Sequence, residues 1–413
     1  MSKPYGLLGR SLGHSYSPVI HHELTGVDYV LFEREPDELE AFLRGDEWGA
    51  LNVTMPYKIE AAKLCDELSP LAQRLGNVNT IIRREDGTLY GHNTDYEGFL
   101  TMAKTLDIEL AGRKVVVFGG DGGVGTTVMQ LLEDMRANAV PVTLDGPNNY
   151  SNLELHADAT FAVNCTPVGM YPDCPASVVS LDTYPRLEGL IDVVYNPART
   201  GLAMQAEERG IPYRTGLLML VAQAAHSEEL FRGEKIPLER IEDVAARLSA
   251  SEQNVALIGM PGCGKTRVGE QLSQILGREH VDIDHALEAR LGTTCADFIK
   301  TQGEDAFRRE ETALLSDVAK RSRLVISCGG GVVTRRENYP LLHQNSQIVM
   351  LDRPLDELAT KGRPLSQRDG VYKLAEQRMP AYRGWADLIV KSTDCAAHTA
   401  QKVAAELPPM LER

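Results

Sequence analysis

The segments KVVVFGGDGGVGTT (residues 114–127) and NVALIGMPGCGKT (residues 254–266) share one pattern, a run of apolar residues followed by a glycine-rich turn. A helical pattern follows each turn, over residues 128–135 in the first case and 268–276 in the second. A buried strand, a glycine turn and a helix in this order open an α/β unit. The repetition of this opening predicts two separate α/β units in the chain.

The bulk composition is that of a globular protein with more than one domain. The chain has 413 residues, of which 43% are hydrophobic and 24% charged. This length exceeds what one ordinary hydrophobic core organises. The net charge of −15 argues against a nucleic-acid partner, because affinity for nucleic acids rests largely on cationic contacts.

The N-terminal residues and the cysteines predict a cytoplasmic protein. The opening MSKPYGLLGRSLGHS has no long apolar segment after a charged start, as a signal peptide would have. No run approaches the roughly 20 apolar residues of a membrane helix. The seven cysteines are scattered, without Cys-x-x-Cys pairs or metal-ligand spacing. We therefore expect reduced thiols and no membrane partner.

The second glycine turn, GMPGCGKT (259–266), fits the phosphate-binding pattern Gly-x-x-x-x-Gly-Lys-[Ser/Thr]. Gly262 and Gly264 let backbone N–H groups curl around phosphate oxygens. Lys265 reaches the β- and γ-phosphates, and Thr266 can ligate Mg²⁺. Because an apolar run precedes the turn and a helical pattern follows it, the context favours a nucleotide site over a glycine turn with a surface lysine.

Polar motifs follow this loop in a fixed order. Asp282 and Asp284 are two residues apart at the predicted end of a strand, so we expect both to point to one face. There they could hold Mg²⁺ and accept the proton of an attacking hydroxyl, whereas a helix N-cap at Asp284 is the alternative. Further candidates lie in GEDAFRREE (Arg308), SCGGGVV (Gly330), KGRPLSQ (Arg363) and MPAYRGW (Arg383).

This order of motifs, over residues 253–413, resembles shikimate kinase. The resemblance implies a P-loop domain, a three-layer α/β/α fold like that of nucleoside-monophosphate kinases, which binds ATP and Mg²⁺. It implies Lys265 and Thr266 as ATP–Mg²⁺ contacts and Asp282 as a second Mg²⁺ contact. The segment LATKGRPL lacks the arginine that usually stacks on adenine there, and Lys361 is the candidate replacement.

The same resemblance implies the residues that handle shikimate. Asp284 would orient the 3-hydroxyl or accept its proton. Arg308 and Arg383 would clamp the substrate carboxylate, and Gly330 with its neighbours would approach the ring. Arg363 would close over the transferring phosphate. A guanidinium fork suits a carboxylate, and phosphoryl transfer is mainly positioning plus charge neutralisation.

Polar segments also precede the first glycine turn. Ser15 and Ser17 in GHSYSP (13–18) lie on one side of a segment that we expect to be extended, where paired hydroxyls can grip a small anion or cap a turn. Further candidates lie in ALNVTMPYK (Thr54 and Lys58), GNVNTI (Asn79) and GHNTDYEG (Asp95). By itself, a lysine and an aspartate in separate loops would be a solvated pair.

These segments resemble shikimate dehydrogenase over nearly all of residues 4–233. The match continues through NCTPVGM (164–170), DVVYNPARTGL (192–202) and GLLMLVAQAAHSEELF (216–231). The resemblance implies an α/β substrate domain followed by a Rossmann-like domain. The expected boundaries are 1–98 for the substrate domain, completed by 216–233, then 99–215 for the dinucleotide domain, 234–252 for a linker helix and 253–413 for the kinase domain.

The dehydrogenase resemblance also implies a catalytic pair and a set of substrate contacts. Lys58 and Asp95 would be the pair, with Lys58 stabilising or protonating the alkoxide formed when 3-dehydroshikimate is reduced to shikimate. The substrate contacts would be Ser15 and Ser17 at the carboxylate, Thr54, Asn79 and Gln223 at ring hydroxyls, and Tyr195 near the substrate.

The first glycine turn fits the dinucleotide fingerprint Gly-x-Gly-x-x-Gly. Gly120, Gly122 and Gly125 occupy its three positions, with Gly123 beside them, directly after an apolar run and before a helical pattern. Asp121 lies between the first two glycines, where its carboxylate would weaken pyrophosphate binding unless it points to solvent. The turn therefore predicts a dinucleotide site, the weaker of the two nucleotide sites.

The residues after this turn favour NAD over NADP. Asp145 ends the next predicted strand about 20 residues beyond the turn, where an acidic side chain accepts a hydrogen bond from the ribose 2′-hydroxyl and repels a 2′-phosphate. No arginine or lysine occurs from residue 137 to 184, and a few residues are left for a helix.

Together these features predict a bifunctional enzyme. Its first part would reduce 3-dehydroshikimate with NAD or NADP, and its second part would phosphorylate shikimate with ATP and Mg²⁺. One alternative is a kinase fused to a dehydrogenase-like part that is non-catalytic or oxidises quinate or shikimate. The other is a shikimate-sensing regulator without catalysis. The expected partners are small molecules, and a homo-oligomer is compatible with the sequence.

Overall fold

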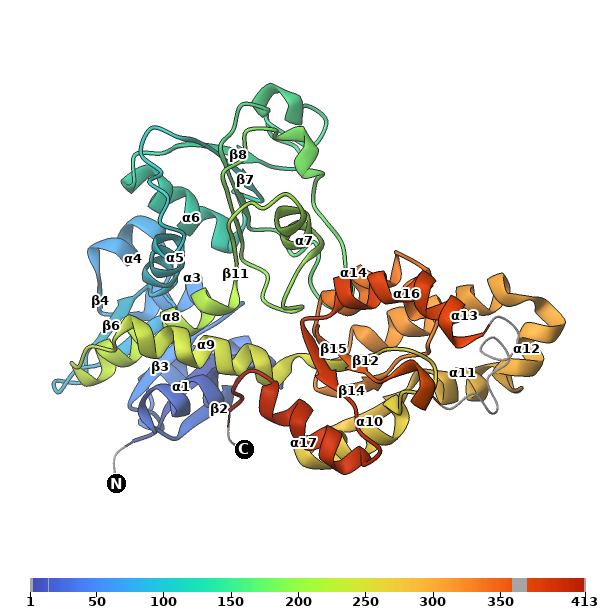
Figure 1. Ribbon diagram of the computed structural model, residues 1–413. Helices are drawn as coiled ribbons and strands as arrows, with labels where there is room; N and C mark the ends of the chain where they lie inside the picture. Colours follow the sequence, from blue (N-terminus) through green and yellow to red (C-terminus); the bar gives the residue numbers. More distant parts are fainter. Residues whose placement is uncertain (1–2, 14, 359–369, 412–413) are drawn as a thin grey trace. The chain divides into compact units, whose positions relative to one another are not determined.

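In the computed structural model, which describes residues 3–13, 15–358 and 370–411, the chain forms three β-sheets flanked by helices (Figure 1). Its contacts divide it into two compact units. The first comprises residues 1–168, 177–195 and 205–246, and the second comprises residues 169–176, 196–204 and 247–413. Two sheets belong to the first unit and one to the second. Within the described ranges, no helix is long and apolar enough to span a bilayer.

The first sheet has six strands in the order β2-β1-β3-β5-β6-β4. Strands β1, β2 and β3 are parallel, whereas β5 is antiparallel to both of its neighbours, β3 and β6. The strands are β1 (Tyr5–Gly9), β2 (Tyr29–Glu33), β3 (Ala50–Val53), β4 (Glu67–Leu68), β5 (Thr80–Arg83) and β6 (Leu89–His92). The helices between them are α1 (Ser17–Thr25), η1 (Pro36–Glu38), α2 (Leu39–Arg44), α3 (Lys58–Leu64) and α4 (Pro70–Leu75).

The second sheet is parallel throughout, in the order β11-β10-β9-β7-β8. Its strands are β7 (Lys114–Phe118), β8 (Asn138–Val142), β9 (Phe161–Asn164), β10 (Gly189–Asp192) and β11 (Tyr213–Thr215). The helical segments around it are α5 (Asp95–Lys104), α6 (Gly123–Asp134), η2 (Leu153–His156), η3 (Leu181–Thr183) and α7 (Gly201–Glu208). The strand order reverses at β7, and ligands of such sheets bind outside the carboxyl ends of the strands at this point.

Helix α8 (Leu217–Arg232) follows the last strand of the second sheet and packs against α1, α5 and β5. The chain thus returns to the first sheet after completing the second. Helix α9 (Leu238–Glu252) comes next, with Ile241, Val244 and Leu248 buried on one face. The contact-based units divide α9 at residue 246, and Gln253 alone separates α9 from the next strand.

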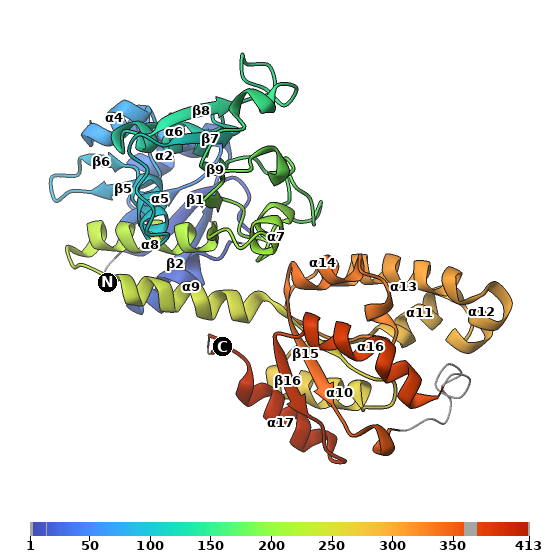
Figure 2. The same cartoon turned by 45° about the horizontal axis from the view of Figure 1, so that its top comes forward.

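The third sheet is also fully parallel, in the order β13-β14-β12-β15-β16. Its strands are β12 (Asn254–Ile258), β13 (Glu279–Asp282), β14 (Leu324–Ser327), β15 (Ser346–Asp352) and β16 (Leu388–Lys391). Helices lie on both faces, with α10 and α17 on one and α14 and α16 on the other (Figure 2). The helical segments are α10 (Lys265–Leu276), α11 (Ile283–Leu291), α12 (Cys295–Gln302), α13 (Glu304–Ala319), η4 (Val332–Thr334), α14 (Asn338–His343), η5 (Leu355–Glu357), α16 (Val371–Trp385) and α17 (Ala396–Glu406). This is the three-layer α/β/α arrangement expected for residues 253–413.

Candidate active sites

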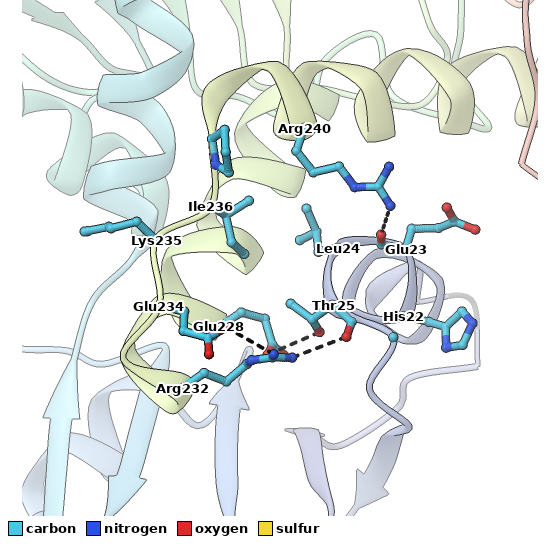
Figure 3. Close-up of a pocket in the computed structure, with 12 residues that line it drawn as sticks. His22, Glu23, Leu24, Thr25, Glu228, Arg232, Glu234, Lys235, Ile236 and Arg240 are labelled. Atoms are coloured by element: carbon cyan, nitrogen blue, oxygen red, sulfur yellow. Dashed lines mark hydrogen bonds and ion pairs between the residues drawn. The ribbon is translucent and has the colours of Figure 1, made fainter.

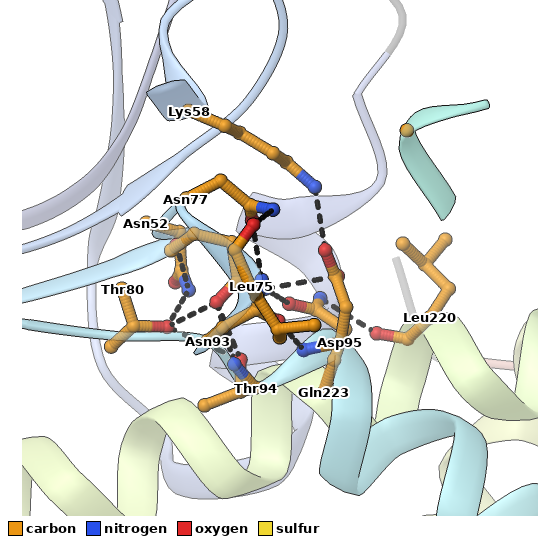
Figure 4. Close-up of polar contacts among 12 residues, drawn as sticks. Asn52, Lys58, Leu75, Asn77, Thr80, Asn93, Thr94, Asp95, Leu220 and Gln223 are labelled. Carbon is orange, nitrogen blue, oxygen red and sulfur yellow. Dashed lines mark hydrogen bonds and ion pairs between the residues drawn. The ribbon is translucent and has the colours of Figure 1, made fainter. Parts of the chain in front are cut away.

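Lys58 and Asp95 form an ion pair in the first unit. Each is the first residue of its helix, α3 and α5 respectively. Lys58 Nζ lies 2.6 Å from Asp95 Oδ2, and the two side chains are 20% and 14% exposed (Figure 4). The carboxylate therefore fixes the position of the ammonium in a partly enclosed place. The two residues expected to act together are in direct contact.

Asn79 holds Asp95 from the other side. Its Nδ2 donates to Asp95 Oδ1 at 2.9 Å, and its Oδ1 accepts from the Thr94 backbone N–H at 2.7 Å. Because a backbone N–H can only donate, the second contact fixes which end of the amide is oxygen. Asn79 Nδ2 also lies 3.4 Å from Gln223 Oε1 of α8. Asp95 is thus oriented from two directions, by an amine and by an amide.

A cavity of about 250 Å³ opens beside this ion pair. Its lining comes from strands β1 and β3, from the N-terminal ends of α1, α3, α5 and α6, from α8, and from the segment after β10. The lining residues are Leu7, Ser15, Ser17, Asn52, Val53, Thr54, Lys58, Asn79, Asp95, Val124, Val193, Tyr195, Gly216, Met219, Leu220 and Gln223. Hydroxyl, amide and ammonium groups converge on it, as a small polyhydroxylated acid requires.

Residues 15–18 are not extended, since Tyr16 has helical φ and ψ of −80° and −7° and Ser17 begins a helix, so the expectation of an extended segment is wrong there. Ser17 begins α1 with Pro18 in the first turn, where the fixed φ of proline suits a helix and its missing N–H costs nothing. Ser15 Oγ donates to Ser17 Oγ at 3.2 Å. Both serines line the cavity at a helix N-terminus, whose free N–H groups and dipole favour an anion.

Tyr195 lies at the cavity rim and is 41% exposed. Its ring meets the ring of Tyr16 edge to face, with centroids 5.9 Å apart. Tyr16 stands between the two cavity serines, so this aromatic contact joins the segment after β10 to the start of α1. Tyr195 thus lies where it can cover one end of a bound molecule.

The first glycine turn connects β7 directly to α6. Gly119 has φ +73°, which glycine adopts without strain, and Gly122 is the N-cap of α6 without any side-chain cap. A Cβ on Gly125 would lie 2.1 Å from Gly119 O, whereas one on Gly123 would meet nothing within 4 Å. Close packing of helix on turn and uncapped N–H groups at the helix start fit a pyrophosphate.

Both acidic residues near this turn are exposed. Asp121 lies within the turn and Asp145 three residues after β8. Burial and, secondly, the charge of Asp121 raise the pKa of Tyr150. The only helical segment described between β8 and β9 is η2, and the loop before it is closed by Asn149 Nδ2 donating to Gly146 O at 3.0 Å. The connection between β8 and β9 therefore contains little helix, as the sequence predicts.

In the second unit, Lys265 lies inside the curl of the second glycine loop. It is buried, and its Nζ donates to Gly259 O at 2.8 Å and to Met260 O at 3.1 Å. Gly262 and Gly264 have φ of +88° and +101°, which explains the need for glycine there. The loop lines a cavity of about 680 Å³ together with residues 282, 284, 330 and 392–394. The ammonium is therefore poised for phosphate oxygens.

Asp282 and Asp284 do not share a strand end, contrary to the expectation. Strand β13 ends at Asp282, which caps α11 by accepting from the His285 N–H at 3.1 Å, and Asp284 lies in the first turn of that helix. The capping role thus belongs to Asp282 rather than to Asp284. Asp282 Oδ2 also accepts from Thr266 Oγ1 at 2.6 Å. Both carboxylates still line the same cavity.

The surroundings of Asp284 suit a proton acceptor. Burial and, secondly, the charge of Asp282 raise the pKa of Asp284, while Lys265 and Arg308 oppose this shift. A carboxylate whose pKa is raised towards neutrality takes up a proton more readily than an exposed one.

Arg308 and Glu311 form a buried pair on α13, with Arg308 Nη1 2.7 Å from Glu311 Oε2. The glycine run after β14 makes room for them. A Cβ on Gly331 would lie 2.1 Å from Arg308 Cζ, and one on Gly329 would lie 2.5 Å from Glu311 Oε1. Arg308 Nε has no hydrogen-bond partner among the described residues. A buried guanidinium with a free donor is suited to an anionic ligand.

The arginine beside this group is Arg378, not Arg383. Arg378 is buried and donates from Nη1 to Gly330 O at 2.9 Å. Arg383 is exposed and lines, with Tyr372 and Met379, a cavity that adjoins the one at the phosphate loop. On α16, Arg378 shares the buried face of residues 374 and 382, at intervals of four, and Arg383 falls outside it. Arg363 and Lys361 lie outside the described residues.

Sequence reasoning missed Arg378, Glu311 and Gly119. The four-residue spacing on α16 could have singled out Arg378, because apolar residues mark the same face. Glu311 looked like one more charge on a helix, and nothing in the sequence announces that it is buried. Gly119 precedes the fingerprint glycines, and its positive φ depends on how β7 turns into α6.

Comparison with known families finds a match in each of the two units. The model of the shikimate dehydrogenase substrate binding domain matches residues 7–81, and the shikimate kinase model matches residues 261–408. The shikimate dehydrogenase (NADP(+)) of Clostridium perfringens is 32% identical to this chain over 268 residues, which cover 60% of this chain and 98% of that protein.

Solved structures similar to the first part of the chain are dehydrogenases. A chorismate mutase/shikimate 5-dehydrogenase fusion protein from Clostridium acetobutylicum is 35% identical with a TM-score of 0.56, covering 59% of this chain and 96% of that one. A quinate dehydrogenase from Corynebacterium glutamicum, solved in complex with NAD, is 28% identical with a TM-score of 0.54, covering 59% and 98% respectively.

Proposed function

We propose that this chain, which belongs to the shikimate dehydrogenase family over about 60% of its length and carries a shikimate kinase domain after it, makes shikimate from 3-dehydroshikimate and then phosphorylates it. The observation that carries the first half is the Lys58–Asp95 ion pair beside a cavity of about 250 Å³. The second half rests on Asp284 in one cavity with the phosphate-loop lysine.

In the dehydrogenase site, Lys58 acts on the oxygen at position 3 of the substrate. A bound nicotinamide dinucleotide supplies or accepts the hydride. Lys58 stabilises and protonates the alkoxide that forms on reduction, and in the reverse direction it takes the hydroxyl proton. Asp95 keeps the ammonium in place, and Asn79 fixes Asp95. Lys58 is the catalytic residue of this set.

The rest of the cavity orients the ring. Ser15 and Ser17, at the N-terminus of α1, would bind the carboxylate, because hydroxyls and a positive helix end suit an anion. Thr54 and Gln223 also line the cavity and would bind ring hydroxyls. Tyr195 would cover the bound molecule from the rim.

The dinucleotide would lie on the turn at Gly119–Gly125, and we propose NAD rather than NADP. The uncapped start of α6 fits a pyrophosphate. Asp145 after β8 would accept from a ribose hydroxyl and repel a phosphate there. The C. perfringens relative is named for NADP(+) and the C. glutamicum structure contains NAD. Steady-state kinetics with both cofactors decide this, and higher kcat/KM with NADPH would reject it.

In the kinase site, Lys265 and the backbone of residues 259–266 would hold the phosphates of ATP. Thr266 Oγ1 and Asp282 Oδ2, 2.6 Å apart, are the hard oxygen donors that Mg²⁺ prefers. A bound Mg²⁺–ATP supplies the phosphoryl group and part of the charge neutralisation. Asp284 orients the 3-hydroxyl of shikimate and accepts its proton.

The kinase substrate carboxylate would bind between Arg308 and Arg378. Arg308 carries a free Nε donor, and Arg378 lies beside Gly330. Arg378 takes the place that the sequence suggests for Arg383, which lines a different cavity. Replacing Arg378 by Met raises the KM for shikimate about tenfold or more, because a charge-assisted bond is lost, whereas Arg383→Met changes it little. Equal effects would return the role to Arg383.

Lys58→Ala tests the dehydrogenase half. Without the ammonium, the rate of shikimate oxidation, followed at the nicotinamide absorbance, falls about 10³-fold. Kinase activity of the same preparation stays unchanged, which shows that the second unit is intact. If Lys58→Ala retains the rate of the unmodified chain with both cofactors, the dehydrogenase assignment fails.

Asp284→Asn tests the kinase half. Phosphorylation of shikimate falls about 10³-fold, while ATP binding measured by calorimetry is kept. In the unmodified chain, the raised pKa of Asp284 makes kinase kcat/KM fall on acidification at a pH above the ordinary aspartate pKa. Retained turnover in the Asn variant contradicts the role of Asp284 as proton acceptor.

Oxidation of quinate is a second candidate for the first half. The loop after β8, with Asp145 and no nearby lysine or arginine, suits NAD, and the NAD-bound C. glutamicum relative is a quinate dehydrogenase. Comparing kcat/KM for quinate and shikimate with NAD separates the two, and Lys58→Ala abolishes either reaction.

A further inference from the structure

Two helices carry dehydrogenase cavity residues and also meet each other. Helix α1 brings Ser17 to the cavity and α8 brings Gln223. On α1, His21 lies one turn beyond Ser17 and on the same face. On α8, Glu228 lies five residues beyond Gln223. The separation of Ser17 and Gln223 across the cavity therefore depends on how α1 and α8 are held together.

His21 and Glu228 meet in the interior between these helices. His21 Nδ1 lies 2.6 Å from Glu228 Oε1, and the side chains are 1% and 0% exposed. The imidazole also stacks on Tyr29, with ring centroids 3.8 Å apart and 12° between planes. Thr25 Oγ1 adds a longer contact to Glu228 Oε2 at 3.4 Å. The His21–Glu228 contact joins residues that are 207 positions apart in the sequence.

The geometry fixes the protonation of this pair. Burial lowers the pKa of His21, although the hydrogen bond and the charge of Glu228 oppose this shift. His21 Nε2 has no hydrogen-bond partner among the described residues, which places the ring proton on Nδ1. Nδ1–H then donates to the Glu228 carboxylate. The result is a short, directional bond between α1 and α8, made by two buried side chains.

A gain in folding stability does not by itself explain why a buried polar pair occurs here. Burying a carboxylate is costly, and well-packed apolar residues of similar volume are often at least as stabilising as a buried polar pair. A directional bond differs from an apolar contact because it fixes the relative position of its two helices. Neither side chain lines the substrate cavity, so any effect on the substrate passes through the backbones of α1 and α8.

Side chains of α8 and α9 also hold the C-terminal end of α1. Figure 3 shows Arg232 of α8 and Arg240 of α9 reaching the last carbonyls of α1. Arg232 Nη1 donates to Thr25 O at 3.3 Å, and Arg240 Nη2 donates to Glu23 O. These cations are favourable at a helix C-terminus. His21–Glu228 therefore acts on a helix that is already fixed at one end, and it governs the segment towards Ser17.

We propose that His21 and Glu228 are positioning residues of the dehydrogenase half, which hold α1 against α8 and so set the distance between the two serine hydroxyls and Gln223. This inference rests on the proposed shikimate site. Loss of the pair would affect binding of the substrate carboxylate in particular, because α1 carries the groups that we propose for it. Loosening α1 weakens recognition of the carboxylate and leaves Lys58 and Asp95 in place.

The test uses the full chain and two substrates, shikimate and its methyl ester, in which the carboxylate is a neutral ester. In Glu228→Leu, we expect the KM for shikimate to rise about tenfold, with kcat changed much less. The preference for shikimate over the ester, as a ratio of kcat/KM, falls by a similar factor. Kinase activity in the same sample reports that the second unit is intact.

Matched controls lie next to each residue. His22→Leu changes the neighbouring, exposed histidine of α1, and Glu229→Gln changes the next carboxylate of α8, which bonds Lys235 and Ile236 instead of α1. Both controls keep the shikimate KM and the preference over the ester. If they shift these values as much as Glu228→Leu does, the inference fails.

A double variant separates position from stability. His21→Leu/Glu228→Leu replaces the whole pair by apolar side chains and should recover most of the melting temperature lost in a single variant. We expect the raised KM and the lost preference to persist in it. Wild-type KM and preference in a stable double variant would overturn the proposal, because the pair would then be structural only.

Failure of the proposed function gives a different result. If the unmodified chain oxidises neither shikimate nor quinate with either cofactor, the dehydrogenase assignment fails. The inference is then tested by measuring the affinity for shikimate by calorimetry in an Arg308→Ala variant. In this variant the kinase site no longer contributes to binding. Equal affinity with and without Glu228→Leu in that background overturns the inference independently.

Discussion

The two glycine loops of this chain begin alike and are equipped differently. Both leave the carboxyl end of an interior parallel strand and open a helix, α6 after β7 and α10 after β12. The second loop places Lys265 inside its curl and pairs Thr266 with a carboxylate. The first has only backbone N–H groups and carries an exposed aspartate, Asp121. The second loop adds the charge of a lysine to its backbone N–H donors. The first loop has backbone N–H donors only, so ligand binding there would depend on their position.

This difference determines what a mutation can remove. A loop that recognises phosphate through a lysine loses most of its function with that side chain. A loop that uses backbone donors is insensitive to side-chain removal and sensitive to added atoms. The physical reason is that a desolvated ammonium contributes a large electrostatic term, whereas backbone donors need close approach.

The largest effect is expected at Lys265. Lys265→Ala removes the cation that we propose for the phosphates of ATP, so we expect kinase kcat/KM to fall about 10³-fold, while shikimate oxidation is unchanged. Lys300→Ala, an exposed lysine on α12, is the matched control and keeps full activity. Coupled assays for ADP release measure both. More than a tenth of the activity remaining in Lys265→Ala contradicts the comparison.

A smaller but clear effect is expected at Gly125. The Cβ of Gly125→Ala would lie 2.1 Å from Gly119 O, so the turn must open and the KM for the dinucleotide rises about 10²-fold. Gly123→Ala, two residues away with open space around its Cβ, changes it less than about twofold. Equal effects of the two alanines would show that the turn is not the dinucleotide site.

A further test concerns Asp145 and the choice between NAD and NADP at the first loop. In Asp145→Ser, the ratio of kcat/KM for NAD to that for NADP falls about tenfold, because repulsion of a 2′-phosphate is lost together with a hydrogen bond to the ribose. Glu154→Gln neutralises another exposed acid of the same connection and leaves the ratio unchanged. An unaltered ratio in Asp145→Ser removes this residue from cofactor selection.

The smallest effect is expected at Asp121. Its exposed carboxylate is screened by water, so Asp121→Asn lowers the dinucleotide dissociation constant only about threefold. Raising the ionic strength of the binding assay reduces the gain. A loss of affinity in the Asn variant would instead make Asp121 a contact of the bound cofactor.

Much of both sites follows from the sequence because the chemistry uses short motifs. Lys58 and Asp95 come together as expected, and Asn79 joins them. The roles of these residues stay proposals, as do those of the kinase residues. The errors concern local geometry. Asp284 lies in a helix instead of at a strand end, because Asp282 takes the capping position.

The sequence by itself determined the fold class, the two nucleotide loops and the order of the polar motifs. A glycine turn after a buried strand needs only neighbours along the chain, so its pattern is local. Only the tertiary structure decided that Arg378 is inside and Arg383 outside, and that His21 meets Glu228. Burial of a charged side chain depends on how distant segments pack, and no local pattern encodes the packing of α1 on α8.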